Sequence, residues 1–183
     1  NAKTHYKRVG DYWSALNIPF NGRTMKTLPN GKVTNPAWSA AFISWSIIQQ
    51  GIGKDQFRGH AGHWNYINDL IDNKLSNPLY QIMDPADYAP QPGDLLHYGR
   101  ESAANYDLAA AKFHLDADTF YPSHSDFVYE VDLTSKELTT IGGNVENSVK
   151  TKKITIKSDG TLGPRISSGK SYPWIAVLKL RDA

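Results

Sequence analysis

The hydrophobic positions of this chain follow a helical period in its first part and a strand-like pattern in its second. Apolar residues three to four positions apart predict an amphipathic helix over residues 5–16 and another over 62–75. Residues 21–34 are polar and rich in glycine, which predicts a long loop. Asn35-Pro36 then marks a helix start, and the residues after it are apolar around most of the circumference. We therefore expect a central, largely buried helix there.

From residue 79 onwards, β-branched and aromatic residues dominate short segments that turn residues separate. These predict strands over residues 79–83, 94–98, 125–132, 136–141, 149–156 and 174–180. Helices come first and strands follow without βαβ alternation, which favours an α+β domain with N-terminal helices packed on an antiparallel β-sheet. A chain of 183 residues is expected to form one domain over 1–183. The Ala-rich segment 101–121 is interpreted as an insertion containing a short helix.

The composition narrows the classes of partner and chemistry. The net charge is only +2, which is too small to indicate nucleic-acid binding. The chain has no cysteine, so disulfides, thiolate metal sites and cysteine catalysis are excluded. No apolar stretch is long enough to span a membrane. Because the chain begins at Asn1 and not at Met, we expect that an upstream signal, tag or further domain has been removed.

Ser39 is the first candidate for chemistry, because it lies near the start of the central helix. With Asn35 as N-cap it would be the fourth helical residue, where the positive end of the helix dipole favours a developing alkoxide or oxyanion. The alternative is an ordinary small residue at a point where this helix crosses the sheet.

His124 begins an expected strand and would share one strand face with Asp126. A histidine at this place can act as general base towards a serine hydroxyl when a third group orients its second nitrogen. Asp126 or Asn144 are the candidates for that third group, the latter because pairing of two successive strands would bring it near His124. A purely structural hydrogen bond between His124 and Asp126 remains the alternative.

Several familiar sites are absent from the sequence. It has no GxSxG nucleophile elbow, no P-loop, no GxGxxG motif after a strand and no HExxH pair. We predict no cofactor and no bound metal. Pro92-Gly93-Asp94 is interpreted as a turn into a strand, with the Asp94 side chain binding nearby backbone N–H groups.

Taken in order, three segments resemble a known group of cell-wall peptidases. They are 35–42 (Asn-Pro-Ala-Trp-Ser-Ala-Ala-Phe), 92–96 (Pro-Gly-Asp-Leu-Leu) and 123–128 (Ser-His-Ser-Asp-Phe-Val). The chain is similar to the papain-like NlpC/P60 and CHAP peptidases. Alignment on Phe42 places Ser39 on the family's cysteine nucleophile and His124 on its catalytic histidine. More closely, residues 37–44, 63–67, 92–94, 124–126 and 141–145 resemble the bacterial family DUF2272, whose layout is similar to that of NlpC/P60.

The resemblance implies a papain-like, NlpC/P60-type fold and a peptidoglycan hydrolase that cleaves peptide or amide bonds. It implies a bacterial, extracytoplasmic protein, secreted or periplasmic, whose partners are peptidoglycan or its stem peptides, with a cognate inhibitor or delivery protein as a further partner. Ser39 would be the nucleophile, His124 the general base, and Asp126 or Asn144 the orienting group. The predicted substrate-binding residues are Trp38, His63, Trp64 and Tyr66.

Two other functions remain open at this point. Serine ionises far less readily than cysteine, so a scaffold that carries serine in this place can be a non-catalytic domain that binds peptidoglycan or a protein. The lesser alternative is a zinc hydrolase that uses His63, His124 and Asp126.

Overall fold

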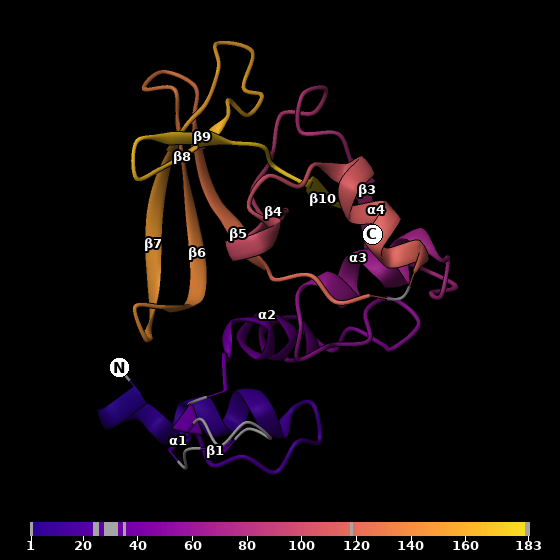
Figure 1. Cartoon of the computed structure of the whole chain (residues 1–183), viewed down its shortest axis with the longest axis vertical. Helices are drawn as coiled ribbons and strands as arrows, with labels where there is room; N and C mark the ends of the chain where they lie inside the picture. Colours follow the sequence, from indigo (N-terminus) through magenta and orange to yellow (C-terminus); the bar gives the residue numbers. More distant parts are fainter. Residues whose placement is uncertain (1, 24–25, 28–32, 35, 118, 182–183) are drawn as a thin grey trace.

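The computed structural model describes residues 2–23, 26–27, 33–34, 36–117 and 119–181 (Figure 1). Its α-helices are α1 (Ala2–Ser14), α2 (Ser39–Ile48), α3 (Trp64–Ile71) and α4 (Leu108–Asp116), and a short 3-10 helix, η1, covers Glu101–Ala103. The three predicted helices and the short helix in segment 101–121 are therefore confirmed. No helix in these ranges is long and apolar enough to cross a membrane.

The main sheet has six strands, in the order β3-β10-β4-β5-β6-β7, and every neighbouring pair is antiparallel. The strands are β3 (Tyr80–Met83), β4 (Leu95–Gly99), β5 (Ser123–Asp132), β6 (Glu137–Val145), β7 (Ser148–Thr155) and β10 (Ala176–Leu180). All six predicted strands are present, and the α+β class is confirmed. Two small hairpins lie outside this sheet: β1 (Lys26–Thr27) with β2 (Val33–Thr34), and β8 (Arg165–Ser167) with β9 (Lys170–Tyr172).

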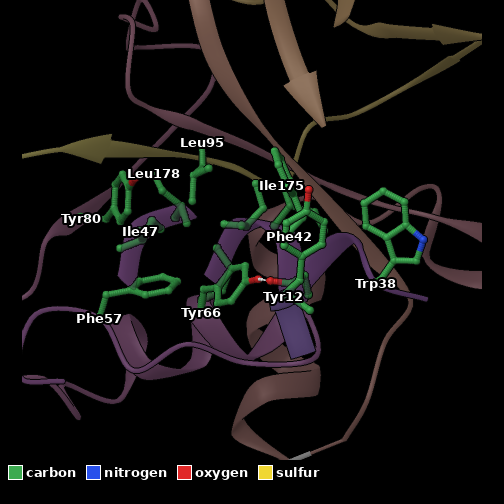
Figure 2. Packing of buried hydrophobic residues seen from close by; sticks show 14 of the residues in the cluster. Tyr12, Trp38, Phe42, Ile47, Phe57, Tyr66, Tyr80, Leu95, Ile175 and Leu178 are labelled. Atoms are coloured by element: carbon green, nitrogen blue, oxygen red, sulfur yellow. Dashed lines mark hydrogen bonds between the residues drawn. The ribbon is translucent and has the colours of Figure 1, made fainter. Parts of the chain in front are cut away.

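Helix α2 is the centre of the packing, as its all-round apolar sequence predicts. It contacts α1 on one side and β5 and β6 on the other (Figure 1). Seven of its ten residues are buried, from Ser39 to Ser44 and Ile47. Figure 2 shows Phe42 and Ile47 among aromatic rings that come from helices, loops and strands. The burial of so many of its residues fixes α2 against the sheet and gives Ser39 a rigid support.

The start of α2 differs from the expectation. The helix begins at Ser39, so this residue is the first of the helix and not the fourth. Trp38 is the N-cap and makes no capping hydrogen bond through its side chain. Asn35, the predicted N-cap, lies outside the described residues. The first-turn N–H groups of α2 therefore lie closer to the Ser39 side chain than the sequence-based boundary implies.

The Pro92-Gly93-Asp94 turn has the structural role predicted for it. Gly93 has a φ of 97°, which favours glycine. The two carboxylate oxygens of Asp94 accept hydrogen bonds from the backbone N–H groups of Gln91 and Leu180, each at 2.8 Å. The turn thus ties the start of β4 to the end of β10.

A close approach between α2 and β6 depends on Gly143. A Cβ atom built on this glycine would lie 2.6 Å from Phe42 Cβ.

We expect Gly143→Ala to lower the free energy of unfolding by about 1 to 3 kcal/mol, because the backbone would have to shift in a packed core. Urea denaturation measures this. Gly163→Ala is the matched control, since no atom lies within 4 Å of its Cβ position. Equal stabilities of the two variants would contradict this packing.

Candidate active site

The side chain of Ser39 contacts His63. The Ser39 Oγ and His63 Nε2 atoms are 2.7 Å apart, and both residues are buried. His63 is the N-cap of α3, so the start of one helix faces the start of another. The sequence pointed to His124 as the partner of Ser39 and to His63 as a substrate-binding residue. The structure instead places the His63 ring against the hydroxyl group.

His124 is held by the strand residue two positions further on. Its Nε2 atom lies 2.8 Å from Asp126 Oδ1. The other carboxylate oxygen of Asp126 is 3.2 Å from Lys152 Nζ and 3.4 Å from the Tyr98 hydroxyl. Burial raises the pKa of Asp126, but the hydrogen bond and charge of His124, followed by those of Lys152, outweigh it, so this pKa is below its ordinary value. Asp126 is therefore a buried carboxylate at neutral pH.

Gly142 on β6 makes room for this carboxylate. A Cβ atom at this position would lie 1.7 Å from Asp126 Oδ1 and 3.3 Å from His124 Nε2. Any other residue would therefore displace the Asp126 side chain. The pair of glycines that precedes Asn144 thus has two separate roles, since Gly143 admits Phe42 and Gly142 admits Asp126.

The two histidines lie next to each other. The centroids of the His63 and His124 rings are 4.8 Å apart, and the ring planes are inclined by 49°. The Nδ1 atom of each ring is buried and has no hydrogen-bond partner among the described residues. The Asp126 carboxylate can only accept, so a neutral form of His124 would carry its proton on Nε2 and would leave Nδ1 as an acceptor.

The same reasoning applies to His63. If its Nε2 accepts the Ser39 proton, its own proton is on Nδ1, which is then a donor. In these forms one Nδ1 atom is a donor and the other an acceptor, although no hydrogen bond joins them. The charge state fits this assignment, because burial, followed by the neighbouring His124, His97 and Arg100, lowers the pKa of His63 well below its usual 6.5. A neutral His63 has a free lone pair with which to accept a proton.

Ser39 and His63 line a pocket of about 420 Å³, which we call the serine cleft. Trp64 lines the same cleft, as the sequence predicts for a substrate-binding residue, and its ring meets that of Phe120 at 6.2 Å in an edge-to-face contact. Phe120 is 67% exposed and comes from the segment 101–121. The serine cleft thus has an aromatic wall to which the segment contributes.

His124 and Asn144 line a second pocket of about 520 Å³. Because Arg100, Lys152 and Arg165 also line it, we call it the basic pocket. Asn144 has a φ of 58° at an irregularity between β6 and β7. It reaches the neighbourhood of His124, as strand pairing predicts, although no hydrogen bond joins their side chains. Arg100 and Glu101 line both pockets and connect them.

Two of the predicted substrate-binding residues lie in the core. Trp38 and Tyr66 are 4% and 2% exposed and belong to the main hydrophobic cluster. The Tyr66 hydroxyl donates to the Ala40 carbonyl at 2.7 Å, which ties α3 to α2. Figure 2 shows both residues within the packing. Neither lines the serine cleft or the basic pocket, so we assign them to stability and not to substrate binding.

No motif or periodicity in the sequence marks Lys152, Tyr98 or Arg165 as site residues. The Lys152 ammonium group contacts both Asp126 and Tyr98. Each of these contacts joins elements far apart in the sequence, which no local pattern indicates.

The zinc alternative gains no support from the geometry. Within the described ranges, no group of three histidine, aspartate or glutamate side chains is arranged to hold a metal ion. The Nε2 atoms of His63 and His124 instead face Ser39 and Asp126.

Comparison with known proteins gives one family match. The family described as "Uncharacterized protein conserved in bacteria (DUF2272)" matches residues 1–180. No curated protein and no solved structure matches the chain.

Proposed function

From the premise that this chain belongs to the bacterial family DUF2272, we propose that it is a hydrolase that cleaves peptide or amide bonds of peptidoglycan. The observation that carries the proposal is the 2.7 Å contact between Ser39 Oγ and His63 Nε2 at the start of α2 and in an open cleft. A serine with a neutral histidine at this distance is the arrangement that nucleophilic catalysis requires. Because peptidoglycan lies outside the cytoplasmic membrane, an enzyme with this substrate would act outside the cytoplasm.

In the first step, Ser39 Oγ attacks the carbonyl carbon of the scissile bond. His63 Nε2 takes the hydroxyl proton, and the first-turn N–H groups of α2 face the negative charge that develops on the carbonyl oxygen. The C–N bond then breaks, and His63 returns the proton to the leaving amine. The product of this step is an ester between Ser39 and the acyl half of the substrate.

In the second step, water attacks the ester. His63 accepts a proton from the water, the carbonyl–Oγ bond breaks, and the proton passes to Ser39. A free carboxylic acid leaves. His124 lies directly beside His63, with ring centroids 4.8 Å apart, and the Asp126 carboxylate bonded to His124 offsets part of the positive charge that His63 gains.

The layout of the domain supports the same reaction class. A buried helix carries the nucleophile on an antiparallel sheet, the Pro-Gly-Asp turn leads into β4, and His124 is the second residue of β5, which pairs with β4. This is the order that a papain-like, NlpC/P60-type fold would have, and we propose that fold for the chain. The difference is that a second histidine, His63, lies between the nucleophile and His124.

The test is digestion of purified peptidoglycan by the native chain, with fragments identified by mass spectrometry. We expect new fragments that end at one type of peptide or amide bond. Retention on the polymer without any cleavage would contradict the enzyme and favour the non-catalytic binding domain. If a metal chelator abolishes the cleavage, the result would favour the zinc hydrolase.

A further inference from the structure

The basic pocket collects positive charge from three separate elements. Arg100 follows β4, Lys152 lies on β7 and Arg165 begins β8. The acids that line the pocket are Glu101 and Glu146, and Glu146 already forms an ion pair with Lys150. Within the described part of the chain, Arg100 forms no ion pair. Lys152 is paired with Asp126, so Arg100 and Arg165 supply the excess of positive charge over Glu101 beside the serine cleft.

Arg165 is held rigidly in this pocket. The central carbon of its guanidinium group lies 4.6 Å from the centre of the Tyr98 ring and 5.0 Å from that of Tyr172. One of its terminal nitrogens donates to the Gly99 carbonyl at 3.1 Å. Two aromatic rings and a backbone acceptor thus fix the plane of the group, so little side-chain freedom is lost when a ligand binds.

The basic pocket has a continuation on one side. Tyr98, Lys152 and Arg165 also line a pocket of about 390 Å³, together with Asp126 and with Lys153, which pairs with Glu137. The serine cleft and the basic pocket share Arg100 and Glu101 in their linings. A substrate seated at Ser39 would therefore reach the basic pocket past these two residues.

We infer that the basic pocket is a subsite for a carboxylate of the substrate, bound by Arg165, Arg100 and Lys152. A guanidinium fork matches a planar carboxylate, and the peptides of peptidoglycan carry free carboxylates. The inference rests on the proposed function, because it takes the ligand to be a peptide of that polymer. It adds a requirement that the hydrolysis itself does not impose, namely a negative group near the scissile bond.

The test measures binding without turnover. Stem peptides released from peptidoglycan are prepared as free acids and as carboxamides, and are titrated calorimetrically into the full chain carrying Ser39→Ala. We expect the free acid to bind at least about tenfold more tightly than the carboxamide. Adding Arg165→Gln or Arg100→Gln should remove this difference. Because Arg100 is exposed, its replacement keeps the test valid even if Arg165→Gln fails to fold.

Lys179→Gln is the matched control. It removes the same charge, but Lys179 lies on β10 over the Tyr88 ring and lines none of these pockets. It should keep the full preference for the free acid. Equal binding of the two peptides, binding of neither, or a preference that survives both arginine replacements would overturn the subsite. If carboxylate-dependent binding is found and the native chain cleaves nothing, the subsite stands and the proposed hydrolysis fails.

Discussion

Ser39→Ala is expected to reduce cleavage of peptidoglycan by roughly 10³-fold or more, with little change in the melting temperature. The substitution removes the only atom that forms a covalent bond with the substrate in the proposed reaction. It deletes one hydroxyl whose side chain, among the described residues, hydrogen bonds to His63, so the packing of α2 keeps its other contacts. Initial rates of fragment release and thermal unfolding of the same samples measure the two effects.

Ser46→Ala is the matched control for this prediction. Ser46 is on the same helix, and its hydroxyl donates to the Phe42 carbonyl at 2.9 Å, away from the serine cleft. It should cleave at nearly the native rate. If both variants cleave like the native chain, Ser39 is not the nucleophile.

His63→Gln is expected to cause a loss as large as that of Ser39→Ala. Glutamine can keep a hydrogen bond to the serine hydroxyl, but it cannot accept its proton. Because the two residues act as one unit, the Ser39→Ala, His63→Gln double variant should be no slower than either single variant. Cleavage rates of the three variants, measured side by side, give this comparison.

The pH profile of the native chain provides a second measurement of His63. Since its pKa is lowered, His63 stays neutral as the pH falls through 6.5. The acid limb of kcat/KM that reports its protonation should therefore lie below pH 6.5. An activity already lost through protonation of His63 above this pH would contradict the assignment.

Two other histidines serve as comparisons. His114→Gln should leave the rate nearly unchanged, because His114 bonds to Tyr106 and Thr119 within segment 101–121 and lines neither site pocket. His124→Gln should slow the reaction less than His63→Gln, since His124 acts through His63. If His124→Gln abolished cleavage and His63→Gln spared it, the general base would be His124, as the sequence pattern had predicted.

Local patterns in the sequence were sufficient to predict most of the architecture. The all-round apolar character of α2, the alternation in the strands and the turn at Gly93 each depend on residues close in the chain. The same reasoning placed Ser39 at a helix start and His124 with Asp126 on one strand face. The hairpin of β8 and β9 was missed because its strands are only three residues long and mostly exposed.

The pairing within the site depends on contacts that no periodicity encodes. His63 meets Ser39 because the loop after α2 returns its chain to the start of that helix, and the residues of that loop are irregular in conformation. Lys152 reaches Asp126 across β6, where Gly142 leaves space for the carboxylate. Both contacts join segments whose relative positions follow from packing of the whole domain. The sequence therefore indicates which residues are candidates, but not which of the two histidines faces the serine.

The central claim is that His63 makes Ser39 nucleophilic, and reaction with a fluorophosphonate tests it without any knowledge of the substrate. In this reaction Ser39 Oγ would form a bond to phosphorus, fluoride would leave and His63 would take the proton. Mass spectrometry of the intact chain and its fragments then locates the adduct. We predict one adduct, on Ser39, in the native chain and in the Ser46→Ala control, and none in His63→Gln. An unmodified Ser39 in the native chain, or equal labelling in His63→Gln, would contradict the claim.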